Sequence, residues 1–249
     1  MLAELMLLIS ALTVGILIGC VGIGGVLLPP ALVYFGGFDL HLAMATSMWS
    51  FLFTGGVGTL AYSRRNSLDW RMVLWLGAGT VPSAVLGALS NAALPGGALT
   101  VLLAALIVAA GVNALTKAPS ADRPAYSFGN LLLFLIGVVV GFGSALTGTG
   151  GPVLLVPILT FMKAPVLSAI AASQAVSIPV AFFSTFGYVL FSRVDFAFGT
   201  ALGLIAAVGV VIGMLIAHAV PVLALRRIVA VSLVGVGILI IVRVLVTGA

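Results

Sequence analysis

The sequence predicts an all-α polytopic membrane protein made of two inverted repeats of about five helical segments each. Three observations lead to this fold class: the composition, the spacing of apolar runs, and the recurrence of the same small residues after 126 positions. Of the 249 residues, 63% are apolar and 6% are charged, and the mean hydropathy is +1.39. A soluble domain carries about a quarter charged residues, so lipid must be the solvent here.

The apolar runs set the number of helical segments. Two are short, Ile23–Phe35 and Thr149–Met162. Each opens with glycines and contains proline, so we expect broken segments near the membrane centre, and their length leaves open whether they cross fully. The other runs approach or exceed the roughly 20 residues that a spanning helix needs: Leu2–Cys20, His41–Tyr62, Trp70–Ala92, Ala98–Leu115, Phe128–Leu146, Val166–Phe191, Phe196–His218 and Val222–Val246.

The chain divides into two similar halves. The polar stretch 117–127 reads as a linker between a first repeat, 1–116, and a second, 128–249. Apolar composition alone does not align glycines, a tyrosine and an aspartate at one offset, so these matches indicate an internal repeat of the kind found in transporters. At a shift of 126 residues the matches include Gly22 with Gly148, Gly24 with Gly150, Gly25 with Gly151, Ser47 with Ser173, Tyr62 with Tyr188 and Asp69 with Asp195.

The basic residues favour inversion of the halves. Lys and Arg gather on the cytoplasmic side of membrane proteins. Suppose that each short segment returns the chain to the side where its preceding helix began. The halves are then inverted and both termini lie outside. Only Arg193 and Arg243 then face outside, and the basic residues on the inner side are Arg64, Arg65, Arg71, Lys117, Arg123, Lys163, Arg226 and Arg227. Parallel halves are the alternative, with a poorer split of seven to three.

The duplicated glycine clusters are the first candidate for a binding site. Gly22-Ile23-Gly24-Gly25 is followed by Pro29-Pro30, and Gly148-Thr149-Gly150-Gly151 by Pro152 and Pro157. Such breaks in hydrocarbon persist only where protein covers them or a polar cavity receives them. The bare N–H groups that open a half-helix attract anions, because the helix dipole adds partial positive charge. Close packing of helices is the alternative reading of these glycines.

Polar residues that follow the short segments form a second candidate set. Thr46-Ser47 and Ser173-Gln174 lie at equivalent places in two long helices, and Thr149 lies within the second glycine cluster. Their hydroxyl and amide groups suit an oxyanion that has no buried countercharge. Asn113 and Thr147 are weaker candidates of the same kind. Simple interhelical hydrogen bonds are the alternative, worth about 0.6 kcal/mol each.

The absence of buried carboxylates and of catalytic motifs excludes several classes of function. No Asp or Glu lies in the middle of an apolar run, which argues against a carboxylate-based proton or sodium pump. Cys20 is a single cysteine, and no nucleotide-binding or catalytic motif is present, so we expect no enzyme, no cofactor and no metal. We read His41 and His218 as interfacial anchors. The interfacial aromatic belt is read as Trp70, Trp75, Tyr126 and Tyr188.

These motifs resemble those of the TauE/SafE sulfite-exporter-like family, also called TSUP. The similarity rests on the glycines at 15, 19, 22, 24 and 25, then Leu27-Leu28-Pro29 and Ala43-x-Ala45-Thr46-Ser47, and on their second copy. The resemblance implies transport of sulfite, sulfoacetate or other organosulfonates across the bacterial inner membrane. It carries the glycine motifs of the family onto Gly22, Gly24, Gly25, Gly148, Gly150 and Gly151. Pro29-Pro30 is out of register with Pro157, so the halves need not contribute equally.

The leading hypothesis is therefore an alternating-access transporter of small sulfur-containing anions. Its expected partners are the anionic substrate, the bilayer and possible further copies of the chain, with no nucleic acid. An anion channel and a non-transporting scaffold remain alternatives. The candidate substrate-binding residues are Gly24, Gly25, Thr46, Ser47, Thr149, Gly150, Gly151, Ser173 and Gln174.

Overall fold

The computed structural model describes residues 2–65, 68–116, 128–162, 164–191 and 193–219, and two isolated positions beyond them. Within this part of the chain the fold is entirely helical, without strands. The predicted linker, 117–127, and all but two positions of the last predicted apolar run lie outside the described residues.

The described helices follow the predicted runs to within two residues, and each short segment is separate from the helix before it. They are α1 (Leu2–Val21), the 3₁₀ turn η1 (Gly24–Leu27), α2 (Leu28–Gly36), α3 (Leu40–Ser63), α4 (Trp70–Ala93), α5 (Gly96–Thr116), α6 (Asn130–Thr147), α7 (Gly151–Phe161), α8 (Val166–Phe191) and α9 (Phe196–Ala219).

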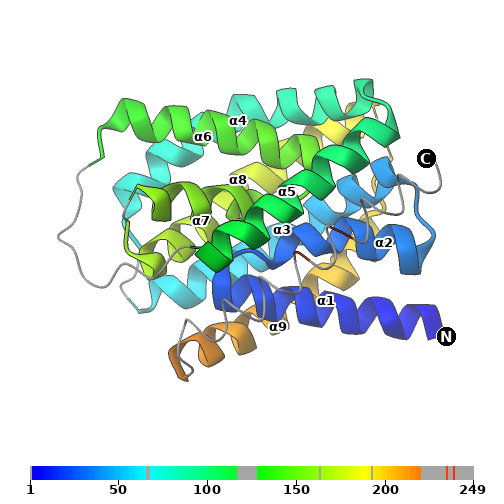
Figure 1. Ribbon diagram of the computed structural model, residues 1–249, viewed down its shortest axis with the longest axis horizontal. Coiled ribbons are helices and arrows are strands. Elements are labelled where there is room, and N and C mark those ends of the chain that lie inside the picture. Colours follow the sequence, from blue (N-terminus) through cyan, green and yellow to red (C-terminus); the bar gives the residue numbers. More distant parts are fainter. Residues whose placement is uncertain are drawn as a thin grey trace.

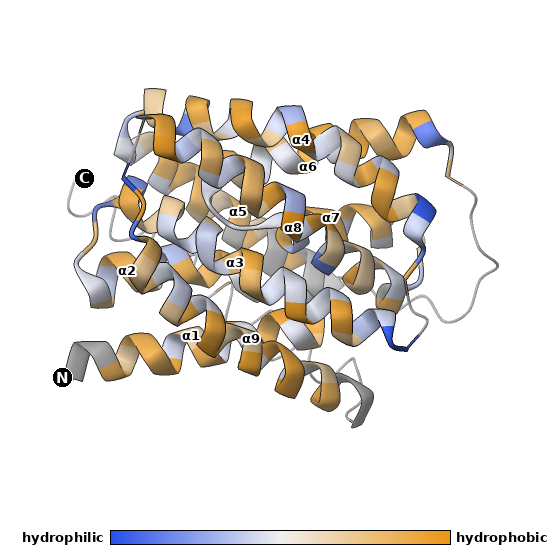
Figure 2. Ribbon diagram, turned by 180° about the vertical axis from the view of Figure 1, so that it is seen from behind, coloured by the Kyte–Doolittle hydropathy of each residue, from blue (hydrophilic) through white to orange (hydrophobic). Residues whose placement is uncertain are grey.

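Four of these helices are long and apolar enough to cross a membrane: α4, α6, and most of α8 and α9. Their large side chains face outward, as with Leu74 at 69% and Leu131 at 71% exposure. The described parts of α1 and α5 form shorter apolar helices, and α3 is not in this set. The α3 helix carries its polar residues, among them Ser50 and Thr54, buried inside the bundle. In Figure 2 the hydrophilic stretches gather at the helix ends.

Aspartates begin three of the long helices. The carboxylates of Asp39, Asp69 and Asp195 accept hydrogen bonds from N–H groups three residues on, at the start of α3, α4 and α9, over 3.0, 3.2 and 2.9 Å. Such caps satisfy a donor that the helix leaves free and contribute about 1 kcal/mol each. Asp69 and Asp195 are one repeat apart, so the same sequence signal starts α4 and α9.

Each half packs against the other through equivalent pairs of helices. In Figure 1, α1 and α9 lie along one side of the bundle and α4 and α6 along the other, with α3, α7 and α8 between them. Small residues allow this packing: a Cβ on Gly15 would collide with the backbone of Ala206, and a Cβ on Gly141 with that of Thr80. These two contacts are equivalent after a shift of 126, because Gly15 corresponds to Gly141 and Thr80 to Ala206. The first helix of each half therefore packs on the fourth helix of the other.

The two central helices meet in opposite directions. Gly55 of α3 lies against Ser177 and Ile178 of α8, and Gly58 lies against Gln174. Residue numbers thus rise along α3 while they fall along α8. Since α8 occupies in the second half the place of α3 in the first, equivalent helices of the two halves run antiparallel at this contact.

Candidate functional site

Both predicted helix interruptions are present. The α1 helix ends at Val21, and Gly22 follows with φ of 77°. The α6 helix ends at Thr147, followed by Gly148 with φ of 65°, and Gly150 has φ of 76°. Positive φ strains every residue except glycine, so these positions explain why glycine occupies both ends. We call the segments 22–25 and 148–151 the first and second breaks.

The two breaks lie against each other in the interior. A Cβ added to Gly25 would stand 2.8 Å from the carbonyl oxygen of Thr149 and 3.2 Å from the ring of Phe51. A Cβ on Gly150 would stand 3.0 Å from the same ring. The breaks therefore meet around one aromatic side chain. All of the candidate residues are buried: Gly24, Gly25, Thr46, Ser47, Thr149, Gly150, Gly151, Ser173 and Gln174.

One face of α3 borders the breaks. Met44, Ser47 and Phe51 follow one another at helical spacing and so share a face. Met44 lies against Gly148, and Phe51 lies against both breaks. Ser47 sits between these two contacts, fully buried, and its Oγ has no hydrogen-bond partner within the described part of the chain. A buried hydroxyl without a partner calls for an explanation, and a missing ligand is one.

The equivalent face of α8 borders them from the other side. Ile170 and Ser173 lie against Gly22, and Ser177 lies against Gly151. Gln174 donates from Nε2 to the carbonyl of Ile18 in the last turn of α1, over 3.3 Å, while its Oε1 lacks a partner among the described residues. Two of the candidate side chains, Ser47 and Gln174, thus carry unpaired buried oxygen atoms.

Three candidate hydroxyls have other partners. The Ser173 hydroxyl donates to the Ile170 carbonyl within α8 over 2.7 Å. The Thr46 hydroxyl accepts a hydrogen bond from the Asp195 N–H over 3.2 Å, so this side chain supports the start of α9. The Thr149 and Thr147 hydroxyls are 2.9 Å apart, and Thr147 donates to the Gly143 carbonyl. Thr149 must then donate to Thr147, so its proton is already engaged. The side chain of Asn113 lies outside the described residues.

The carbonyl ends of both broken helices are satisfied by side chains. At the end of α1, Tyr62 donates its hydroxyl to the Gly19 carbonyl over 2.8 Å. At the end of α6, Tyr188 donates to the Ala145 carbonyl. These pairs are equivalent after a shift of 126, since both donor and acceptor move by one repeat. The last carbonyls of a helix have no partner within it, so the tyrosines supply what the breaks remove.

Asn91 of α4 provides a further donor to the second break. Its Nδ2 donates to the Leu146 carbonyl over 2.7 Å, and its Oδ1 is 3.0 Å from Nδ1 of His41. Because the amide nitrogen is used as a donor, Oδ1 accepts and His41 carries its proton on Nδ1. Asn91 is not among the site residues predicted from the sequence, although an asparagine at the end of an apolar run is a usable signal.

The N–H ends have no such side-chain partners. No side chain caps η1, α2 or α7. Gly151 and Val153 precede the first hydrogen bond within α7, so the helix itself does not use their N–H groups. Pro29 and Pro30 remove two donors from the start of α2, so glycines 24 and 25 carry the free N–H groups of the first half. Side chains thus satisfy carbonyls of the helices that lead into the breaks, whereas the N–H groups that open the following segments have no side-chain cap.

Basic residues lie at helix ends in the described part of the chain. Arg64, Arg65 and Arg71 flank the turn between α3 and α4, and Arg193 precedes α9. No group of three metal-ligating side chains occurs within this part of the chain. The helix dipoles add partial positive charge at the N–H ends of the segments that follow the breaks.

One cavity lies elsewhere, as a groove of about 320 Å³ between α1 and α2. Its wall is mostly apolar, and the hydroxyls of Ser10 and Thr13 donate to their own helix backbone. These hydroxyl protons are not free for an anion, so we place the candidate site at the breaks.

The predicted interfacial role of Tyr188 is wrong. Trp70 and Trp75 are exposed at 54% and 40%, as a belt requires, but Tyr188 is fully buried. Its ring packs in the core and its hydroxyl binds the end of α6. The periodicity of an apolar helix does not distinguish a lipid-facing tyrosine from one that reaches a broken neighbour.

We predict that Tyr188→Phe lowers the free energy of unfolding by about 1–3 kcal/mol, because the Ala145 carbonyl stays buried without a donor. The thermal unfolding midpoint of the purified protein measures this. Tyr34→Phe, at a residue 38% exposed, is the comparison. Equal midpoints for Tyr188→Phe and the unmodified protein would show that this hydrogen bond does not hold the break.

Comparison with known proteins identifies the family. A model of the family described as "Sulfite exporter TauE/SafE" matches residues 6–240. The chain belongs to this family. It is 27% identical over 178 residues to the "Probable membrane transporter protein MJ0441" of Methanocaldococcus jannaschii, covering 69% of this chain and 67% of that one. No solved structure matches the chain.

A second relative agrees with this assignment. The TauE/SafE chain is 25% identical over 217 residues to the "Probable membrane transporter protein YunE" of Bacillus subtilis, covering 76% of this chain and 78% of that one. Together with the apolar helices, the family and both relatives make the protein a multi-pass membrane transporter.

Proposed function

We propose that this protein moves small sulfur-containing anions, such as sulfite or an organosulfonate, by alternating access, with the anion bound between the two breaks. One observation carries the proposal: protein side chains satisfy carbonyls at both breaks, whereas the N–H groups that open the following segments have no side-chain cap.

This pattern favours an anion over a cation. A cation in a broken helix is coordinated by free carbonyls, while an anion takes free N–H groups at the positive end of the dipole. Here Tyr62, Tyr188 and Asn91 occupy carbonyls in the last turns of the helices that lead into the breaks. The amides of Gly25 and Gly151 remain for a guest, with the Ser47 hydroxyl beside them. Gln174 has a second amide proton that the bond to Ile18 does not use.

Alternating access follows from inverted repeats, which we propose for the two halves. The antiparallel contact of α3 with α8 supports inversion, and the equivalence of the Gly15 and Gly141 contacts supports a two-fold relation between the halves. In such transporters one set of helices rocks against the other around a fixed central site. The arginines at 64, 65 and 71 lie at or beside the connection between α3 and α4, which we propose faces the cytoplasm at a bacterial inner membrane, with both termini outside.

The sulfur chemistry of the substrate rests on the family description. Sulfite and sulfonates present three oxygen acceptors around sulfur, and these suit N–H groups that arrive from several backbone segments. Neutralisation by dipoles and hydrogen bonds removes the need for a buried arginine.

Counterflow into proteoliposomes tests the proposal. We expect saturable uptake of labelled sulfite or sulfoacetate that accelerates when the same anion fills the lumen. A simple pore gives no such acceleration, and an anion channel would then replace the transporter. Absence of flux and of ligand-induced thermal stabilisation with every sulfur anion would instead favour a scaffold.

A further inference from the structure

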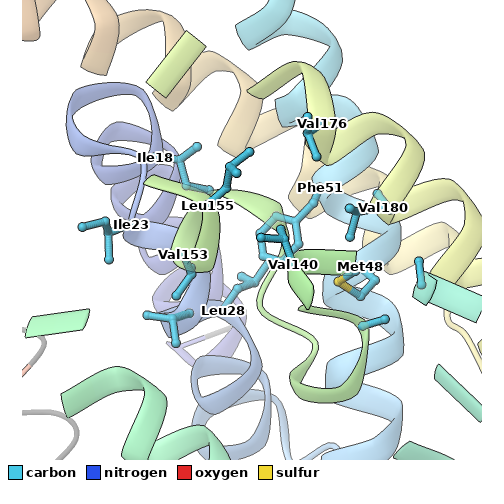
Figure 3. Close-up of a cluster of buried hydrophobic side chains, with 14 of the residues drawn as sticks. Ile18, Ile23, Leu28, Met48, Phe51, Val140, Val153, Leu155, Val176 and Val180 are labelled. Carbon is cyan, nitrogen blue, oxygen red and sulfur yellow. The ribbon is translucent and has the colours of Figure 1, made fainter. Parts of the chain in front are cut away.

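The Phe51 ring occupies the place where the two breaks meet. Its Cζ and Cε1 atoms lie 3.2 and 3.3 Å from a Cβ position on Gly25, and its Cδ2 and Cε2 atoms lie 3.0 and 3.3 Å from that on Gly150. The two breaks therefore contact different edges of one ring. Phe51 is 3% exposed, and Figure 3 draws it at the centre of the labelled buried side chains.

The other half has no equivalent ring. A shift of 126 residues places Ser177 where the first half has Phe51, and Ser177 lies 3.3 Å from a Cβ position on Gly151. Its hydroxyl donates to the Ser173 carbonyl within α8. One half thus closes on the breaks with a large apolar ring, and the other half with a small polar side chain. Packing symmetry alone would favour similar volumes at these positions.

The ring stands among groups that suit an anion. Ser47, one turn before Phe51 on the same face of α3, has the unpaired hydroxyl, and the uncapped start of α7 lies beside the Gly150 contact. An anion held by Gly25 and Gly151 needs the volume between the breaks. In this structure the ring fills that volume, so the ring must move before an anion can enter.

We infer that Phe51 is the occluding residue of the anion site: its ring fills the space between the breaks and swings away when a substrate enters. This inference rests on the proposed function and adds the residue that closes the site. The equivalent position in α8 is Ser177, whose side chain is small. Movement of the Phe51 ring therefore opens the site on the side of α3, while the side of α8 opens only when the helix moves.

The test compares Phe51→Ala and Phe51→Leu with the unmodified protein in proteoliposomes loaded with sulfite or sulfoacetate. Without the ring, we expect downhill anion flux to rise about fivefold or more and acceleration by lumenal anion to fall, because the site no longer closes between cycles. Leucine keeps apolar volume and should give an intermediate flux. Phe182→Ala removes a ring that is 54% exposed and should change neither property.

The outcomes separate the inference from the proposed function. If the unmodified protein neither binds nor carries any of the sulfur anions, both are wrong. If it shows counterflow and the two Phe51 variants match it in flux and in acceleration, only the occluding role is wrong. Should Phe51→Ala fail to fold, as its thermal midpoint would reveal, the leucine variant decides by the same two readouts.

Discussion

Replacing Gly148 by alanine is expected to destabilise the protein more than any other single methyl addition at a turn. The backbone here has φ of 65°, and a Cβ would lie 2.5 Å from Cβ and 2.7 Å from Cα of Met44. Backbone strain costs about 1–2 kcal/mol. The overlap costs about 1–3 kcal/mol more, because the Cα of Met44 belongs to the backbone of α3 and cannot move aside as the end of a side chain could. The thermal midpoint should fall by roughly 5–20 °C.

Gly37 provides a matched control for this variant. It has nearly the same backbone, with φ of 68°, but no atom lies within 4 Å of its Cβ position. Gly37→Ala therefore tests the strain alone and should lose about 1–3 kcal/mol less stability than Gly148→Ala. Equal losses in the two variants would mean that the second break is not packed against α3.

Removing the Ser47 hydroxyl is expected to impair substrate binding without harming the fold. In the described structure Oγ is buried and unpaired, so Ser47→Ala removes a desolvated group and should leave stability unchanged or raise it. If this hydroxyl donates to a bound anion, its loss costs about 1.5–3 kcal/mol, or roughly ten- to hundredfold in affinity. Transport at low substrate concentration and ligand-induced thermal shifts measure the loss.

Ser50 separates binding from packing. Its hydroxyl lies one turn from Thr46 and donates to the Thr46 and Gly199 carbonyls over 3.0 and 2.8 Å, joining α3 to α9. Ser50→Ala should lower stability by about 1 kcal/mol and leave substrate affinity unchanged. Were Ser47→Ala to behave in the same way as Ser50→Ala, the Ser47 hydroxyl would be a packing group.

The length of the apolar runs and the spacing of the glycines were sufficient to predict the described helices and the breaks. Runs of this length have few folded alternatives in lipid, and glycines in equivalent positions of two halves mark where helices stop. The boundaries of α8 agree at both ends with the predicted run. The caps at Asp69 and Asp195 follow from the same repeat.

The partners at the breaks could not be predicted in the same way. Tyr62, Tyr188 and Asn91 act on helices far away in the sequence, and only the packing of α3, α4 and α8 brings them to the free carbonyls. Thr46 was predicted as a site residue but contacts α9 instead. Successive residues of an α-helix are rotated by about 100°, so Ser47 faces the breaks while Thr46 faces α9. Adjacent polar residues on a helix serve different faces.

The most direct test of an anion held by main-chain donors is an NMR titration of protein labelled with ¹⁵N-glycine. It follows the amide ¹⁵N and ¹H signals of Gly25 and Gly151, which are assigned by single substitutions. We expect both signals to move in a saturable way as sulfite or sulfoacetate is added, while Gly37 stays unchanged and sodium or potassium chloride has no equivalent effect. Saturable transport of the anion with unchanged signals at Gly25 and Gly151 would contradict binding between the breaks.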